Sequence, residues 1–530
     1  MVKEALTEDP PLASVDELSG QTLLAGGIWV IASSALPQIY VLASSILIAR
    51  FLTVNDMGRQ SFIAFVSASV VMICSFGFSG SLVRYGGELL GQGRLGSLRG
   101  LVWWTAKIQI AGAIVAGVLL AIIGLFSHDQ VLWMWAALGS TFGTIQNIPS
   151  SVLFVLRRWR EASVITLVIG LAYTVGIAAV LAAGGGLAGL FAIGAGLGGI
   201  AAAWTTWLAW RHLNAVAPRS EPHKELHRPV IGYATTIWAG FLLTFVVLRR
   251  SEFFFLDRYS STKAIAYYSV AFAVIAGFVS MVEALAGVVA PTVASLHGSG
   301  ETSRIGPAFS RAIRLVILLS VPIAALGVVF GPALIRVIYG SDYAHTAAPL
   351  RIMLIPFPLV ALMSLCGGLL WGSGRVRMWL LVFCFAAVVD VGLDFLLIPH
   401  FAEVGAALAN VCAQATAAVL VIGYTMHMFG PVDWQARVLL RAVVTAALAA
   451  GAGWMALGIV GGAAGIVVGG LVALVVFVVL SRWVKTVPAT DGMWISTAVR
   501  GRLGSWIAHV VGFVTAAGPD ELDKLDELVG

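Results

Sequence analysis

Residues 463–480 read AAGIVVGGLVALVVFVVL, a stretch that contains no charged side chain. A helix rises about 1.5 Å per residue, so a stretch of this length crosses most of the roughly 30 Å hydrocarbon core of a bilayer. The whole chain has the same character: 59% of its 530 residues are hydrophobic and 11% are charged, against about 25% charged in an average soluble protein. This composition excludes a soluble fold and predicts an all-α polytopic membrane protein.

Apolar stretches long enough to cross a bilayer recur along the chain, separated by short polar turns. We expect about 14 transmembrane helices, at 22–48, 61–82, 101–125, 131–156, 163–183, 187–210, 231–256, 264–296, 313–335, 347–371, 378–398, 404–428, 438–459 and 463–483.

Basic residues are distributed unevenly between the two sides of these helices. Connections after even-numbered stretches hold 18 Lys and Arg residues, and connections after odd-numbered stretches hold 8. Lys and Arg are enriched in cytoplasmic loops. We therefore expect both termini in the cytoplasm.

An internal repeat accompanies this pattern. A shift of 208 residues aligns Arg50-Phe51 with Arg258-Tyr259, and Ser61 with Ser269. Tandem six-helix halves are common in secondary transporters, so we expect two pseudo-symmetric lobes followed by two more helices. The predicted organisation is a cytoplasmic segment (1–20), a first lobe (21–210), a cytoplasmic linker (211–229), a second lobe (230–428), two helices (429–484), and a cytoplasmic amphipathic helix with an acidic tail (485–530).

Residues that would support catalysis are missing from the pattern. The sequence has no phosphate-binding Gly-rich loop with a Lys and no His/Cys set with metal spacing. The basic residues are scattered rather than clustered, which argues against nucleic acid as a partner despite the net charge of +6. We expect no enzyme activity, no metal and no cofactor.

Ionisable residues inside apolar stretches are the best functional candidates, because they are costly in lipid. Arg249 and Arg250 lie about 27 Å along their helix from its cytoplasmic start. Either they snorkel to the outer headgroups and pair with Glu252 and Asp257, or at least one faces a cavity and holds an anion.

Three further cations are candidates. Arg84 and Lys107 lie toward the cytoplasmic side, where they either set orientation or form an inner anion site. Arg351 would join Arg249 and Arg250 in an outer anion site.

Acidic residues within the spans point to coupling with an ion. Glu283 lies well inside its stretch, and Asp390 and Asp394 are four residues apart, which places them on one helix face. Together with Glu252 and Asp257 they are candidates for proton or sodium coupling. The alternative is a static ion pair with an Arg such as Arg351.

Several short motifs, in order along residues 20–425, resemble those of polysaccharide and oligosaccharide-lipid flippases of the MOP superfamily. They are Ala49-Arg50-Phe51-Leu52 with Asp56-Met57-Gly58, Ser79 to Tyr85, Asp257-Arg258-Tyr259 with Ala266 to Ser269 and Val289-Ala290-Pro291, Tyr339 to Tyr343 with Ala347 to Arg351, and Ile398 to Phe401 with Gly405 to Ala409. One departure is Ala266, where the family commonly has Gly.

This resemblance implies a multi-pass protein of a prokaryotic cytoplasmic membrane. It would move a polyprenyl-pyrophosphate-linked glycan from the inner to the outer leaflet by alternating access, often driven by an ion gradient. Carried onto this sequence, Arg249 and Arg250 are the best candidates for cavity cations. The implied partners are the lipid-linked glycan, membrane lipids and other polysaccharide-assembly proteins.

Three other functions remain open at this point. The first is a cation-coupled drug or metabolite antiporter of the same superfamily. The second is a membrane-embedded polysaccharide polymerase or ligase. Such a protein would need a long outer loop, and the longest outer loop expected here is the stretch 335–346. The third is a proton-pumping respiratory subunit, which should carry Lys and Glu at mid-helix in several spans.

Overall fold

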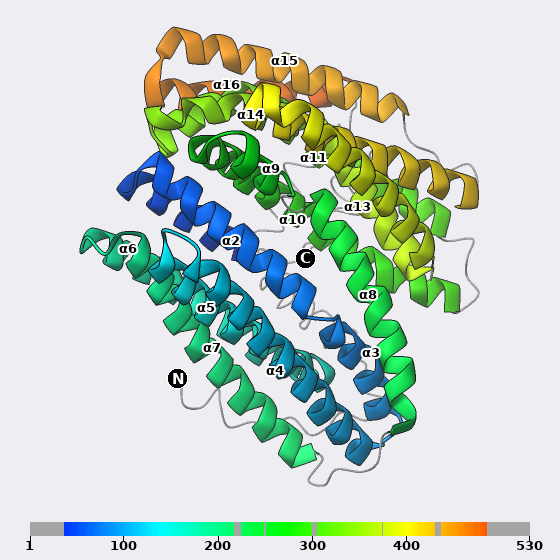
Figure 1. Cartoon of the computed structure of the whole chain (residues 1–530). Helices are drawn as coiled ribbons and strands as arrows, with labels where there is room; N and C mark the ends of the chain where they lie inside the picture. The colour runs from blue at the N-terminus through cyan, green and yellow to red at the C-terminus, as the bar shows by residue number, and fades with distance from the viewer. Residues whose placement is uncertain are drawn as a thin grey trace, which may run out of the picture. The chain divides into compact units, whose positions relative to one another are not determined.

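The computed structural model describes residues 37–216, 224–248, 251–298, 305–373, 375–429 and 436–484. The predicted N-terminal segment, amphipathic helix 494–514 and acidic tail lie outside these residues. The described residues form helices joined by short turns, with no strand among them (Figure 1). After a first helix, Pro37–Phe51, they are α2 (Val54–Cys74), α3 (Phe78–Gly91), α4 (Leu95–Leu125), α5 (Gln130–Val155), α6 (Trp159–Ala182), α7 (Gly186–Val216), η3 (Lys224–Leu226), α8 (His227–Leu248), α9 (Glu252–Tyr259), α10 (Thr262–Gly298), α11 (Ile305–Ile338), η5 (Ser341–Thr346), α12 (Ala347–Leu354), α13 (Phe357–Gly372), α14 (Val376–Phe429), α15 (Ala436–Val460) and α16 (Gly462–Val484).

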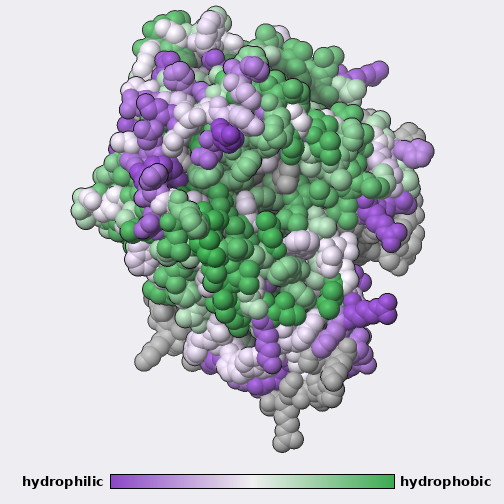
Figure 2. Space-filling model, viewed as in Figure 1, coloured by the Kyte–Doolittle hydropathy of each residue, from purple (hydrophilic) through white to green (hydrophobic). Residues whose placement is uncertain are grey.

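The chain is an all-α polytopic membrane protein. Among the described residues, 9 helices are long and apolar enough to cross a membrane, or 10 if the bent pair of η5–α12 with α13 counts as one span. Hydrophobic side chains cover wide areas of the surface (Figure 2), and Val175, Leu396 and Leu440 are among the exposed ones. In lipid such exposure carries no hydrophobic penalty. The total of 14 spans and the cytoplasmic termini stay predictions.

The chain divides into two compact units. Unit 1 comprises residues 1–41 and 67–238, and unit 2 comprises 42–66 and 239–530. The first helix, α2 and α8 therefore each contribute residues to both units. Unit 1 has a core of apolar side chains from α3, α4, α5 and α7, including Leu82, Leu101, Leu153 and Leu213.

Unit 2 has its own core, built mainly from α11, α13, α14 and α15. Its buried members include Ile313, Phe357, Phe383, Ala417 and Ala446. Alanine and glycine allow these helices to approach closely: the α-carbons of Gly453 on α15 and Gly469 on α16 leave no room for a side chain, because an added Cβ on Gly453 would lie 2.7 Å from the Gly469 carbonyl oxygen.

The predicted span 61–82 is broken rather than continuous. Helix α2 ends at Cys74, and Phe76 and Gly77 take positive φ values of 50° and 70° before α3 begins. A Cβ on Gly77 would lie 2.5 Å from the carbonyl oxygen of Ala234 on α8. The indole Nε1 of Trp238 donates to the Met72 carbonyl, 3.1 Å away, so α8 satisfies a backbone group near the end of α2.

Helix α14 consists of two limbs joined at Ala402, where φ is 47° and ψ is −126°. The limbs coincide with the two predicted stretches 378–398 and 404–428. Glycine is needed just after the turn, because a Cβ on Gly405 would lie 2.4 Å from the Leu397 carbonyl oxygen. The two limbs thus form a tight helical hairpin.

Two further features concern the repeat and the linker. Helix α10 begins at Thr262, 208 residues after α2 begins at Val54, which is the offset of the sequence repeat. Helix α7 continues to Val216 and α8 begins at His227, so helices occupy both ends of the predicted linker 211–229.

Candidate functional site

Three carboxyl groups lie together inside unit 2. Glu252 is the first residue of α9, and Asp390 and Asp394 lie on the first limb of α14. All three residues have 0% exposure, and they lie close enough for their carboxylates to repel one another when charged. The structure therefore brings Glu252 to the Asp pair that the sequence placed on one helix face.

Amide and hydroxyl groups complete this carboxyl cluster. Asn410, on the second limb of α14, donates from Nδ2 to Glu252 Oε1 at 2.6 Å and to the Val247 carbonyl at 3.3 Å. Gln414 Nε2 donates to Asn410 Oδ1 at 2.6 Å. The Ser251 hydroxyl donates to Asp390 Oδ2 at 2.9 Å. The cluster thus joins α9 to both limbs of the hairpin.

The hairpin places Asp394 and Asn410 at the same distance from its turn. Asp394 and Asn410 each lie eight residues from Ala402 on opposite limbs, which is about 12 Å along each helix. The two residues are therefore at matching distances from the turn.

Acceptor atoms outnumber donors at this site. Asp390 Oδ1 and both carboxylate oxygens of Asp394 are buried without a hydrogen-bond partner among the described residues. No described Lys, Arg or His forms a salt bridge with any of the three carboxyl groups. Three buried negative charges without a counter-charge would be very costly. Protons or a cation bound to these carboxyl groups would lower that cost.

Within the described part of the chain, no three His, Cys, Asp or Glu side chains are arranged to hold a metal ion.

The remaining acidic candidates lie elsewhere. Glu283 on α10 and Asp257 on α9 are both exposed, so neither joins the buried cluster. Arg249 and Arg250 lie outside the described residues, between α8 and Ser251, and their orientation stays a prediction.

Arg351 has a structural partner. Its Nε donates to the Val328 carbonyl of α11 at 3.1 Å. In a regular helix that carbonyl would accept from residue 332, but Pro332 has no N–H. Arg351 thus satisfies the group that Pro332 leaves free, and it does not neutralise Asp390 or Asp394. The role of Arg351 as a cavity cation stays a prediction.

Arg84 and Lys107 are both exposed side chains of unit 1. The Arg84 guanidinium lies 4.4 Å from the Tyr233 ring centroid and 5.4 Å from that of Tyr85. It also pairs with Glu88 at 3.5 Å. These contacts hold Arg84 between α3 and the start of α8.

The sequence pointed to the carboxylates but missed Asn410, Gln414 and Ser251. A signal was available for two of them: Asn410 and Gln414 are four residues apart in a largely apolar stretch, the same spacing that drew attention to Asp390 and Asp394.

Comparison with known proteins gives the family. The model of the family described as polysaccharide biosynthesis protein matches residues 47–348. The chain belongs to this family. The match includes Glu252 but ends before α14. The proximity of Glu252 to Asp390, Asp394 and Asn410 is therefore known from the structure alone. No curated protein sequence matches this polysaccharide biosynthesis protein.

Solved structures show which fold this family member has. It is similar to the lipid II flippase MurJ in an inward closed conformation, with a TM-score of 0.65 at 15% identity, covering 86% of this chain and 98% of that one. It is also similar to an inward-facing multidrug resistance MATE family transporter, with a TM-score of 0.64 at 12% identity over 76% of this chain and 98% of that one. A MOP superfamily transporter from Pyrococcus furiosus gives 0.54 at 12% identity, over 77% and 95%. The fold is therefore that of the MOP superfamily.

Proposed function

We propose that this protein moves a polyprenyl-pyrophosphate-linked oligosaccharide from the cytoplasmic to the outer leaflet, coupled to binding of protons or sodium ions. The observation that carries the proposal is the buried carboxyl cluster of Glu252, Asp390 and Asp394 in a member of a polysaccharide biosynthesis family with the MOP fold. Intramembrane carboxyl groups are typical of ion pathways in transporters.

The headgroup of such a lipid cannot cross hydrocarbon unaided, because pyrophosphate charges and sugar hydroxyls are costly to desolvate. Cationic side chains lower that cost by pairing with phosphate oxygens. Arg84 and Lys107 would receive the headgroup on the cytoplasmic side, and Arg249 and Arg250 would hold it before release.

The carboxyl cluster supplies the driving step of this proposal. A proton or a monovalent cation neutralises the buried negative charge and stabilises the packing of α9 against both limbs of α14. Loss of that ion to the other side of the membrane leaves unpaired charge, which favours a different arrangement of these helices. A ligand shifts such an equilibrium only through its different affinity for the two states.

The test is leaflet exchange of a labelled lipid-linked oligosaccharide in liposomes that contain the purified protein. We expect exchange that a proton or sodium gradient accelerates. Asp394→Asn and Glu252→Gln should abolish the acceleration, because an amide cannot release a proton or neutralise a cation. Asp342→Asn, which alters an exposed carboxylate of η5, is the control and should keep it.

A second experiment concerns the cations. Changing Arg249 and Arg250 together to Ala should stop exchange while the protein remains folded in detergent. Normal exchange in this double variant would contradict the assignment of these two residues.

The likeness to the MATE family transporter, with nearly the same TM-score as MurJ, favours one other candidate, a cation-coupled antiporter of small molecules. Gradient-driven transport of a soluble organic cation, without leaflet exchange of any lipid-linked oligosaccharide, would establish the antiporter instead.

A further inference from the structure

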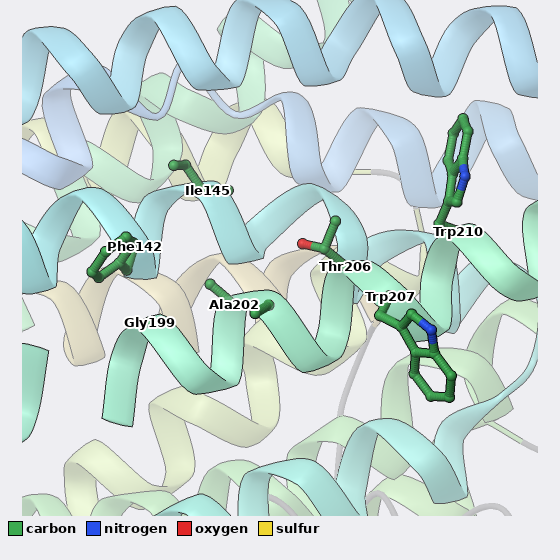
Figure 3. Close-up of a pocket in the computed structure, with 8 residues that line it drawn as sticks. Phe142, Ile145, Gly199, Ala202, Thr206, Trp207 and Trp210 are labelled. Atoms are coloured by element: carbon green, nitrogen blue, oxygen red, sulfur yellow. The ribbon is translucent and has the colours of Figure 1, made fainter. Parts of the chain in front are cut away.

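Two features lie beside or beyond the carboxyl cluster. In unit 1, an open and almost entirely apolar groove of about 460 Å³ lies between α5 and α7 and is lined by Phe142, Ile145, Gly199, Thr206, Trp207 and Trp210, among others (Figure 3). In unit 2, buried aromatic rings connect the carboxyl cluster to residues 42–66. The second feature has a consequence for transport, because it joins the cluster to a segment that continues into the other unit.

Residues 42–66 form a segment of unit 2 that continues into unit 1 at both ends. We call it the docked segment; it comprises the end of the first helix and the first part of α2. The Ser45 hydroxyl lies 3.2 Å from the Tyr339 hydroxyl. The Arg50 Nε donates to the Ile338 carbonyl at 2.6 Å, and a cation at the last carbonyls of α11 is favourable. Polar contacts thus hold one end of the docked segment on unit 2.

The docked segment also approaches the start of α10 very closely. An added Cβ on Gly58 would lie 2.0 Å from the Thr262 carbonyl oxygen, so α2 and α10 meet there without an intervening side chain. The connections after the first, seventh and ninth predicted spans are all expected on the outer side of the membrane. The structure brings these three connections together.

Phe65 is the aromatic residue of the docked segment that leads toward the cluster. Its ring stacks against Phe253 of α9, with centroids 5.5 Å apart, and against Phe245 of α8 at 6.3 Å. Phe253 in turn packs edge-on against Tyr268 of α10 at 5.5 Å. Phe253 and Tyr268 both have 0% exposure. Close-packed rings have little room to move separately.

Phe253 is covalently next to the cluster. It directly follows Glu252 in α9, and consecutive side chains of a helix point about 100° apart. Glu252 therefore bonds Asn410 of α14 while Phe253 stacks on Phe65 of α2. A shift of α9 against α14 must move both contacts.

The titratable groups that face Glu252 come from two helices. Asp390 and Asp394 belong to α14, and Tyr268 of α10 lies within electrostatic range of all three carboxyl groups. When the carboxyl groups are charged they repel one another, and this repulsion acts directly on the first turn of α9.

We propose that Phe253 is a positioning residue that couples the ionic state of the carboxyl cluster to the docking of residues 42–66, an inference that rests on the proposed function. With a proton or a cation on the cluster, α9 packs on both limbs of α14, and the stack of Phe253 on Phe65 holds the docked segment on unit 2. With the carboxyl groups charged, α9 shifts, the stack loosens and the docked segment is released. The ion favours docking because it binds that arrangement more tightly.

The test is the distance between two nitroxide spin labels, measured by pulsed electron paramagnetic resonance on the full chain in liposomes without substrate. The labels are carried by Asn55→Cys and Ser341→Cys in a variant without the four native cysteines. Both residues are exposed; Asn55 lies on the docked segment, and Ser341 begins η5. We expect a short distance at low pH or with Na⁺, and a longer one at high pH without Na⁺. The double amide variant, Glu252→Gln with Asp394→Asn, should keep the short distance throughout.

Variants at Phe65 separate coupling from ion binding, because Phe65 lies on α2 and outside the cluster. In Phe65→Leu the ion-dependent change in distance should be lost, while low pH or Na⁺ still raises the melting temperature. Phe65→Tyr keeps the ring and should keep the change in distance. Phe357→Leu is the matched control: it removes a ring with 1% exposure that packs on Phe278 at 6.0 Å, and it should respond like the unaltered protein.

The outcomes distinguish this inference from the proposed function. If low pH and Na⁺ raise the melting temperature of the unaltered protein no more than that of the double amide variant, the cluster binds no ion and both proposals are wrong. If the ions stabilise the unaltered protein but the distance between the labels does not follow, coupling through Phe253 is wrong and ion binding stands. The same holds if Phe65→Leu responds as Phe357→Leu does.

Discussion

At the residue scale, Asn410 is the side chain that joins the parts of the carboxyl cluster. It donates to Glu252 and to the Val247 carbonyl, and it accepts from Gln414. Asn410→Ala leaves these buried groups without their partner, a loss of about 1–3 kcal/mol. We expect the melting temperature in detergent to fall and gradient-driven leaflet exchange to be lost.

The matched control for this variant is Thr416→Ala on the same limb. Thr416 is only half-buried, and its hydroxyl donates to the Cys412 carbonyl of its own helix, so the melting temperature should change little. A similar loss of stability in both variants would show that Asn410 has no special role.

Gly405 gives a second prediction. Gly405→Ala would place a Cβ 2.4 Å from the Leu397 carbonyl oxygen and force the hairpin limbs apart. We expect a lower melting temperature and weaker coupling, because Asp394 and Asn410 are held by the two limbs. Gly423→Ala, on the second limb, meets no atom within 4 Å and should be neutral or slightly stabilising. Equal melting temperatures for the two variants would contradict the close approach at Gly405.

The sequence predicted part of the cluster. Helical spacing alone placed Asp390 and Asp394 on one face, and the cost of charge in lipid selected Glu252. Spacing carries no information on which helices pack together, so it could neither bring Glu252 to the Asp pair nor separate Glu283 and Asp257 from it. The sequence also suggested Arg351 as a counter-ion for the Asp pair. It could not show that Arg351 bonds the Val328 carbonyl, because that contact depends on how α11 and α12 pack.

At the element scale, that contact between α11 and α12 yields a double-mutant prediction. Arg351→Met removes the donor to Val328 and should cost about 1 kcal/mol. Pro332→Ala restores an N–H to α11, which can then bond the Val328 carbonyl within the helix. In that background Arg351→Met should have almost no effect on thermal stability.

The interaction energy of the cycle is the measurement. If the two substitutions add independently, the Arg351 side chain does not act through the Val328 carbonyl. If Arg351→Met loses leaflet exchange and Pro332→Ala does not restore it, Arg351 has a direct role in transport.

Helix breaks were the least predictable elements. Hydropathy placed one span at 61–82, yet α2 ends at Cys74 and α3 begins at Phe78. The break depends on α8, whose Ala234 and Trp238 contact the turn from a part of the chain more than 150 residues away. No local pattern records that contact. The turn at Ala402 was predictable because Pro399 and Gly405 flank it.

At the scale of the whole molecule, the predicted orientation can be tested by cysteine labelling. In a variant without the four native cysteines, Gln92→Cys and Ala436→Cys should react only from the cytoplasmic side. His128→Cys, Ser341→Cys and Ala463→Cys should react from the outer side. All five residues are exposed at helix ends or turns, so a membrane-impermeant thiol reagent reports their side directly.

The control is permeabilisation, after which all five positions should react. If Gln92→Cys and His128→Cys react from the same side, α4 does not cross the membrane. If Ser341→Cys and Ala436→Cys react from the same side, the count of 14 spans is wrong.

Composition determined the class of the molecule almost by itself. The apolar stretches located the helices because lipid requires every backbone group to be bonded within its own segment. The division into two units was harder to predict from the sequence. Residues 42–66 belong with the second unit, while the next residues of α2 belong with the first. That division depends on packing rather than on hydropathy.

The distribution of the carboxyl cluster along the chain has a consequence for biogenesis. Asn410 follows Glu252 by 158 residues, so at about 5–20 residues per second roughly 8–30 s pass between their synthesis. Throughout that interval Glu252 is without its amide partner. A protonated, uncharged Glu252 costs far less to place in the bilayer than a charged one. Asp394 and Asn410, by contrast, lie on the two limbs of one hairpin and can insert together.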